Sequence, residues 1–132
     1  MLIIGFGNPL RGDDAMGPIA AERLGGLAVH QLTPEMAEEI ASADAVLFLD
    51  ADATLAAGEV VLTPLLPGDA EMTHHASPAG LLQLARRVYG GSPKAWVIGM
   101  GGADFGLREG LTPAAERAVA RALEAAGRLR KG

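Results

Sequence analysis

The sequence contains no cysteine, and this absence excludes several kinds of chemistry at once. Among its 132 residues there are three His and sixteen Asp or Glu, but no Cys. Without thiols the chain can form no disulfide, no thiol nucleophile and no Cys-ligated zinc or iron–sulfur centre. Any metal site must therefore be built from the three imidazoles and the carboxylates.

The sequence also lacks an excess of basic residues and any long hydrophobic run. Its formal net charge is −5, which argues against a nucleic acid as partner. The apolar stretch at residues 2–6 is too short for a membrane span and has no basic start of the kind that begins a signal peptide. We therefore expect a cytoplasmic protein with no membrane partner, and its length predicts one domain over residues 1–132.

What the sequence does contain is a regular alternation of short apolar runs with helical patterns. The predicted strands are 2–6, 27–32, 45–49, 59–64 and 95–99, and the predicted helices are 15–24, 34–42, 78–89 and 113–128. Apolar strands that alternate with helices indicate a sheet covered on both faces. The pattern predicts the α/β class: a single three-layer domain with a mostly parallel, twisted sheet of about five strands, flanked by helices on both faces.

Three of the predicted helices begin with the same local signal. Thr33-Pro34, Ser77-Pro78 and Thr112-Pro113 each place a capping hydroxyl just before a proline. The hydroxyl can accept a hydrogen bond from a free N–H group of the first turn, and proline is tolerated there because its missing N–H has no partner. We expect all three side chains to cap helices.

Polar side chains gather where the predicted strands end, which is where α/β folds bind ligands. The first strand is followed by a glycine-rich loop with an acidic pair, the third by two further acids, and the fourth by two adjacent His. These residues are Asp13, Asp14, Asp50, Asp52, His74 and His75. Carboxylates from two loops and an imidazole from a third form a plausible oxygen and nitrogen ligand set for a divalent metal.

Several of these residues also have ordinary structural explanations. Asp13 lies near a helix start and could cap it, and Asp52 reads as a turn residue. Adjacent His on an extended segment point in opposite directions, so at most one of the pair would reach the same site. His30 is the only candidate ligand in its predicted strand, which favours a structural role for it. Arg11 could bind a substrate carboxylate or be a solvated charge of the loop.

The sequence lacks the motifs of several other common binding and catalytic sites. A dinucleotide-binding G-x-G-x-x-G would need glycine at position 10, which is Leu10. No Gly-Lys-Ser/Thr phosphate-binding loop and no G-x-S-x-G nucleophile motif is present.

Taken together, the first loop, the third-strand acid and the His segment resemble the hydrogenase maturation proteases. These nickel-dependent endopeptidases process the large subunit of nickel–iron hydrogenases. Their N-terminal signature, G-x-G-N-x-L-x-x-D-[DE]-[GA]-x-G, is matched throughout by residues 5–17. Their Asp-Ala after the third strand is matched by Asp50-Ala51, and their [ST]-x-His before a helix by Thr73-His74-His75, which selects His75 over His74.

The resemblance implies a site and a reaction. The family's three nickel ligands, which are also its catalytic residues, fall on Asp14, Asp50 and His75. The metal is expected to be nickel, supplied by the hydrogenase large-subunit precursor, and other divalent metals could replace it. The implied activity is removal of a C-terminal extension from the nickel-loaded precursor.

The chain departs from the family pattern in two places. Asp14 stands where some relatives have Glu. Many relatives also carry Asp-Gly-Gly-Thr after the second strand, thought to help recognise substrate, where this chain has Gln31-Leu32-Thr33-Pro34-Glu35. Glu35 is expected to take a polar role near the site, and Asn8, Arg11 and Glu35 are the predicted substrate-binding residues.

Two other functions remain open from the sequence. One is a non-catalytic nickel-sensing maturation chaperone that uses the same three ligands to check metal insertion. The other is a nucleotide-binding regulatory domain of the same doubly wound type.

Overall fold

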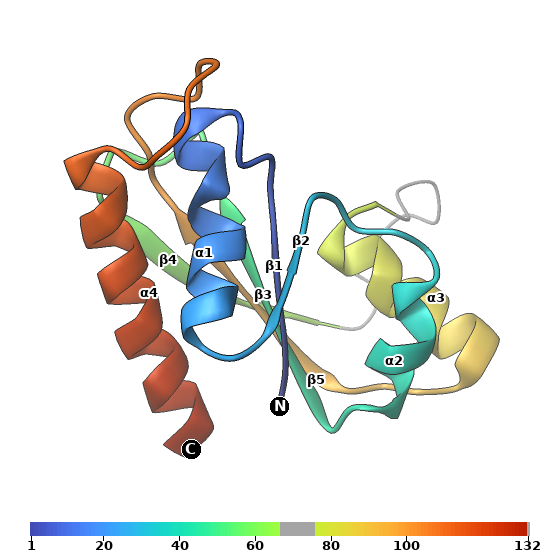
Figure 1. Ribbon diagram of the computed structural model, residues 1–132. Coiled ribbons are helices and arrows are strands. Elements are labelled where there is room, and N and C mark those ends of the chain that lie inside the picture. The colour runs from blue at the N-terminus through green and yellow to red at the C-terminus, as the bar shows by residue number, and fades with distance from the viewer. Residues whose placement is uncertain (67–75, 132) are drawn as a thin grey trace.

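A computed structural model describes residues 1–66 and 76–131 and confirms the predicted α/β architecture. A five-stranded sheet lies between two pairs of helices, with α1 and α4 on one side and α2 and α3 on the other (Figure 1). The strands are β1 (Leu2–Phe6), β2 (Leu27–Val29), β3 (Ala45–Ala51), β4 (Val60–Leu65) and β5 (Lys94–Met100). The helices are a 3₁₀ turn η1 (Gly12–Ala15), α1 (Met16–Arg23), α2 (Met36–Ser42), α3 (Pro78–Tyr89) and α4 (Pro113–Lys131).

The sheet is mostly parallel, as predicted. Its strand order is β2-β1-β3-β5-β4, and only the β4–β5 pair is antiparallel. Strand β3 therefore lies at the centre, between β1 and β5. The carboxyl ends of the four parallel strands meet at one edge of the sheet, where ligand sites of such folds are found.

Alternate residues of the central strand supply two separate cores. Leu47 and Leu49 belong to the cluster under α1 and α4, whereas Val46 and Phe48 belong to the cluster under α2 and α3. All four side chains are fully buried. This explains why β3 reads as a continuous apolar run, since both of its faces are covered by helices.

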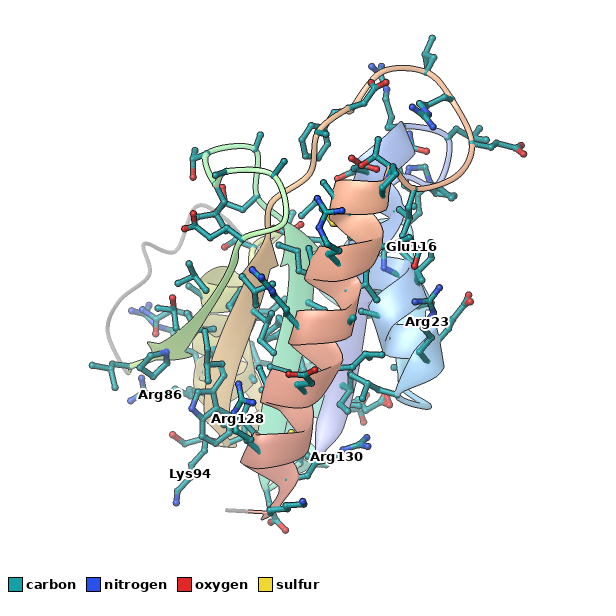
Figure 2. The ribbon with its side chains drawn as sticks, turned by 90° about the vertical axis from the view of Figure 1, so that its left-hand side faces the viewer. Arg23, Arg86, Lys94, Glu116, Arg128 and Arg130 are labelled. Atoms are coloured by element: carbon teal, nitrogen blue, oxygen red, sulfur yellow. The ribbon has the colours of Figure 1, made fainter. Side chains whose placement is uncertain are left out.

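Helix α4 packs on the sheet through small side chains. Its buried face consists of Ala115, Ala118, Val119, Ala122, Ala125 and Ala126. Side chains of this size let the helix lie close to the sheet and to α1. At the rim of this layer Arg23 of α1 and Glu116 of α4 point toward each other, with 3.3 Å between Nη1 and Oε2 (Figure 2).

The predicted helix starts are correct at two positions and wrong at one. The Ser77 hydroxyl accepts a 3.0 Å hydrogen bond from the Gly80 N–H, and the Thr112 hydroxyl accepts one of 3.3 Å from the Ala115 N–H. Thr33 caps nothing with its side chain, because α2 begins only at Met36. Instead the Thr33 carbonyl accepts a hydrogen bond from the Met36 N–H in a turn that precedes the helix.

Two strand ends differ from the prediction by two residues or more. Strand β2 ends at Val29 rather than at residue 32, so His30 follows the strand and is exposed. Strand β3 continues past Leu49 to Ala51, which places Asp50 inside the strand and paired in register with Gly99. No helix of the described residues is long and apolar enough to cross a membrane.

Candidate active site at the carboxyl edge of the sheet

The carboxyl ends of β1 and β3 lie side by side. In the parallel register Phe6, the last residue of β1, is paired with Asp50. The chain leaves β1 at this point and runs through residues 7–11 into η1. The acidic loop after β1 therefore begins beside the acidic end of β3, as the strand-end rule predicts.

Glycines in β1 and at the start of α1 allow the helix to rest directly on these strand ends. A Cβ added to Gly17 would lie 2.6 Å from the Leu49 carbonyl oxygen and still closer to that of Phe6. A Cβ on Gly5 would collide with the Gly17 carbonyl. The conformation of this segment therefore requires residues without side chains at both positions. Because of this close contact, η1 and its two acids lie next to β3.

Asp14 is held in place by the backbone of the same loop. Its Oδ2 accepts a 2.7 Å hydrogen bond from the Asn8 N–H, and the side chain is half-buried. A Cβ on Gly7 would collide with the Asp14 carbonyl oxygen, so the two segments of the loop are in close contact. One carboxylate oxygen of Asp14 is thus fixed by the protein.

Asp50 lies where its negative charge is disfavoured. Burial, together with the negative charges of Asp14 and Asp52, raises the pKa of Asp50 to about 7. A hydrogen bond from the Ala51 backbone lowers the pKa but does not offset these effects. Carboxylates that repel one another in a partly buried place are a common arrangement at functional sites, and a cation would relieve the repulsion.

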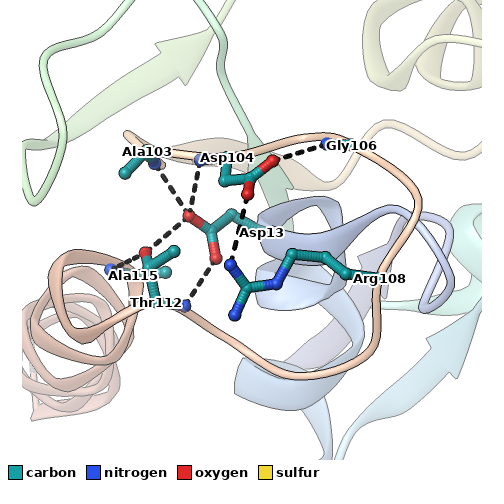
Figure 3. A network of polar contacts seen from close by, with 7 residues as sticks. All are labelled: Asp13, Ala103, Asp104, Gly106, Arg108, Thr112 and Ala115. Atoms are coloured by element: carbon teal, nitrogen blue, oxygen red, sulfur yellow. Dashed lines mark hydrogen bonds and ion pairs between the residues drawn. The ribbon is translucent and has the colours of Figure 1, made fainter.

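Asp13 has a different environment from its neighbour. It is fully buried, and its two oxygens accept hydrogen bonds from residues of the segment after β5 (Figure 3). Oδ2 accepts from the backbone N–H groups of Ala103 at 2.7 Å and Asp104 at 3.1 Å, and from the Thr112 hydroxyl at 2.6 Å. Oδ1 accepts from the Thr112 N–H at 2.8 Å.

These bonds give Asp13 a structural role, although not the one considered from the sequence. It does not cap its own helix, since η1 has no side-chain cap. Burial alone would raise its pKa, but the hydrogen bonds from the side chain and backbone of Thr112 and from the Ala103 and Asp104 N–H groups outweigh burial and lower the pKa. Asp13 therefore joins the loop after β1 to the loop that leads into α4.

Asp52 is a turn residue, as predicted. Its Oδ1 accepts hydrogen bonds from the Thr54 N–H at 2.9 Å and from the Thr54 hydroxyl at 2.6 Å. The hydroxyl and backbone bonds of Thr54 lower the pKa of Asp52. Its charge contributes to the site mainly by raising the pKa of Asp50.

The predicted substrate-binding residues occupy two loops at this edge. The Asn8 side chain is engaged locally, since its Oδ1 accepts a 2.9 Å hydrogen bond from the Leu10 N–H. Arg11 is exposed, and its backbone forms a bridge with that of Arg108. Glu35 is exposed just before α2, and a hydrogen bond from the Thr33 hydroxyl lowers its pKa.

The third predicted ligand, His75, lies outside the described residues, as does His74. The structure thus brings Asp14 and Asp50 together and leaves the position of His75 untested. Among residues 1–66 and 76–131, no three His, Asp or Glu residues form a metal-binding group.

The sequence-based interpretation missed the segment between β5 and α4. Its residues Ala103, Asp104 and Thr112 bind Asp13, and it runs beside the first loop through a hydrogen bond from the Gly12 N–H to the Arg108 carbonyl. Thr112 was recognised only as a helix start. Nothing in the linear sequence indicates that its hydroxyl also donates to an acid 99 residues away.

Comparison with known proteins supports the resemblance to hydrogenase maturation proteases. The support comes from similar structures and not from matching sequences. No family model matches the chain, and no curated protein gives a significant sequence match. The hydrogenase maturating endopeptidase HybD from E. coli aligns with a TM-score of 0.75 and 27% identity, covering 98% of this chain and 91% of that one. The [NiFe] hydrogenase maturation protease HycI from Thermococcus kodakarensis aligns with a TM-score of 0.74 and 26% identity, covering 99% and 92%. An endopeptidase from Escherichia coli aligns at 0.70 and 25%, covering 96% and 90%.

These neighbours are named as endopeptidases or proteases, which are hydrolases, and they share the α/β fold of this chain. More narrowly, the chain has the fold of the hydrogenase maturation endopeptidases over nearly its whole length, so the resemblance inferred from the first loop is confirmed. The expected enzyme class, a peptidase of the hydrogenase maturation type, is the class that these neighbours carry in their names.

Proposed function

We propose that this chain is the endopeptidase that removes the C-terminal extension from a nickel-loaded nickel–iron hydrogenase large-subunit precursor. One observation carries the proposal. Asp14 and Asp50, from separate elements, come within electrostatic reach of each other at the carboxyl edge of a fold shared with hydrogenase maturation endopeptidases. The reaction is expected in the cytoplasm, with the precursor as protein partner.

The proposed nickel site uses Asp14, Asp50 and His75, and the nickel itself is part of the substrate. The chemistry of the donors fits a divalent cation, because two carboxylates and an imidazole supply oxygen and nitrogen ligands. The mutual repulsion that raises the pKa of Asp50 supports this fit, since a bound cation would stabilise both carboxylates in their charged forms. Three protein ligands also leave coordination positions open for the precursor's own groups.

The surrounding residues have defined tasks in this proposal. The Asn8 N–H orients the Asp14 carboxylate by binding one of its oxygens. Arg11 and Glu35 are exposed near the carboxyl edge and are proposed, together with Asn8, to contact the precursor. Asp13 positions the whole first loop through its bonds to the segment before α4.

The proposal is tested with the purified nickel-loaded precursor. Its mass is measured after incubation with the wild-type protein or with Asp14→Asn, Asp50→Asn or His75→Ala. We expect the wild type to shorten the precursor and each variant to slow the trimming at least 100-fold. Asp44→Asn is the matched control, because Asp44 is an exposed acid just before the opposite end of β3.

Two results would overturn the proposal in different ways. An unchanged precursor mass with the wild-type protein would leave binding without catalysis, as a maturation chaperone requires. Normal trimming by all three variants would show that the reaction does not depend on these ligands.

A further inference from the structure

A cavity of about 570 Å³ lies beside the first loop, and its lining includes neither Asp14 nor Asp50. It is open to solvent and is lined by the first loop, α1, the edge strand β2 and the segment before α4. Its walls are mainly apolar and include Pro9, Leu10, Pro18, Ile19 and Ala28. This volume falls within the range of pockets that bind small molecules or side chains, roughly 300–1,000 Å³.

The charged groups of the cavity are acidic. Glu22 of α1 and Glu109 of the segment before α4 line it, together with His30, and no Lys or Arg of the described residues does so. Neither glutamate takes part in a salt bridge within the described part of the chain. An apolar cavity with two unpaired carboxylates is complementary to an apolar group that ends in, or lies next to, a positive charge.

Exposed leucines extend this apolar surface beyond the cavity. Leu10 is 57% exposed at its wall, and Leu107 is 80% exposed on the neighbouring segment. The two segments are joined, because the Arg108 N–H donates a 3.1 Å hydrogen bond to the Leu10 carbonyl. Large apolar side chains gathered on a surface commonly mark a contact with another protein.

The cavity adjoins the loop that carries Asp14. Gly7 and Ala15 line it, and both adjoin Asp14: Gly7 packs against the Asp14 carbonyl, and Ala15 follows it in the chain. The loop that fixes the Asp14 carboxylate is therefore also a wall of the cavity. A chain that entered the cavity would lie against this loop.

Strand β2 makes an extended polypeptide the best-fitting occupant. It is the terminal strand of the sheet and pairs only with β1 among the described residues. Its residues Ala28, Val29 and His30 line the cavity. A sheet edge next to a cavity is the arrangement that proteins use to bind extended peptides, with the backbone on the edge and side chains in pockets.

We propose that this cavity binds a segment of the precursor close to the cleaved bond: an apolar stretch that carries a lysine or arginine for Glu22 and Glu109. The inference rests on the proposed function, since it assigns a substrate-binding surface to the same reaction. It adds the chemistry of the recognised segment, which the two carboxylates of the metal site do not specify.

The first experiment measures cleavage kinetics with the nickel-loaded precursor. The double variant Glu22→Lys/Glu109→Lys is expected to raise KM about tenfold, with little change in kcat, because it turns attraction for a cationic segment into repulsion. Glu38→Lys/Glu124→Lys is the matched control, since these exposed acids lie on α2 and α4, outside the cavity lining, and the overall charge changes equally. Equal KM values for the two double variants would overturn the inference.

A second experiment does not depend on cleavage, so it separates the inference from the proposed function. Backbone NMR spectra are recorded with a synthetic peptide of alternating Val and Ala that carries one central Lys, and with the same peptide carrying Glu. The Lys peptide is expected to shift the amide signals of Ile19, Glu22 and Ala28, and the Glu peptide to leave them in place. Identical effects of the two peptides, or none, would overturn the inference even if the precursor is cleaved.

The NMR experiment also tests the cavity as a peptide site if the enzyme proves inactive. Selective shifts by the Lys peptide would support the cavity as a peptide site although the proposed function had failed. A second copy of this chain is the competing occupant. A dimer in solution that dissociates on Ala28→Arg would overturn the inference in favour of self-association.

Discussion

Asp13 and Thr112, 99 residues apart, bind each other twice: the Thr112 hydroxyl donates to Oδ2 at 2.6 Å and the Thr112 N–H donates to Oδ1 at 2.8 Å. The same hydroxyl accepts a hydrogen bond from the Ala115 N–H in the first turn of α4. One side chain therefore both caps a helix and satisfies a buried carboxylate. Because Asp13 precedes Asp14, this contact connects the start of α4 to the candidate active site.

Removing the Thr112 hydroxyl tests this connection. Thr112→Val keeps the shape of the side chain but loses the donor to Asp13 and the acceptor for the buried Ala115 N–H, and Asp13 Oδ2 keeps only the Ala103 and Asp104 N–H donors. We expect the free energy of unfolding to fall by about 1–3 kcal/mol. Urea unfolding at neutral pH measures the loss. Thr112→Ser, which retains the hydroxyl, is expected to recover most of it, and equal losses for the two variants would contradict this role.

The close contact between α1 and the strand ends leads to a second prediction. Gly17→Ala places a methyl group 2.6 Å from the Leu49 carbonyl oxygen and nearer still to that of Phe6. Because backbone atoms cannot move aside cheaply, we expect a destabilisation of about 2 kcal/mol or more, measured as a lower midpoint of thermal unfolding.

Gly127→Ala is the matched control for that substitution. Gly127 lies within α4, and a Cβ there meets nothing within 4 Å. Alanine is favoured over glycine in a helix interior, so this variant should be stabilised by about 0.5–1 kcal/mol. If both variants changed stability in the same direction, the loss in Gly17→Ala would not come from the close contact with the strands.

The parts of the fold that could be predicted are those determined by local pattern. Strand β3 and helix α4 are continuous apolar or periodic segments, so sequence alone places them. The expected position of Asp50 beside the first loop also follows, because parallel strands end at a common edge. The site could be anticipated to this extent from strand-end placement.

What could not be predicted depends on contacts between distant segments. Asp13 and Asp14 are identical in type and adjacent, yet one accepts hydrogen bonds from residues 103–112 and the other accepts one from its own loop. Thr33 resembles Ser77 in sequence but precedes a turn rather than a helix. The raised pKa of Asp50 likewise arises from burial and neighbouring charges that only the folded chain brings together.

The pKa of Asp50 is the basis of a third prediction, for the metal-free protein. Titration of the carboxyl carbons by NMR should give a pKa of about 7 for Asp50. Burial is the largest cause and the charge of Asp14 the next, so Asp14→Asn should lower this pKa while leaving it above the ordinary value of 3.8 for an aspartate. Asp44→Asn, at the other end of β3, should leave it unchanged. A wild-type pKa near 4 would contradict the electrostatic description of the site.

The same shift makes stability depend on pH, and its sign is fixed. The pKa of Asp50 is higher in the folded protein than in the unfolded chain, where it is close to 3.8, so folding favours the protonated carboxyl. The contribution of Asp50 is therefore fully present below about pH 4 and is lost as the pH rises toward 7. Asp50→Asn, which cannot ionise, should escape this loss. The lowered pKa of Asp13 acts in the opposite sense at more acidic pH, in both proteins alike.

Urea unfolding of metal-free wild type and Asp50→Asn between pH 4 and pH 8 measures this effect. Relative to the wild type, the variant should gain about 1–3 kcal/mol across the interval, a range reduced from the full shift because Asp50 is only half-buried. Most of the gain should occur below pH 7, and the difference should level off above it. Asp44→Asn should run parallel to the wild type throughout. A constant difference between wild type and Asp50→Asn over the whole interval would show that Asp50 ionises alike in the folded and unfolded chains.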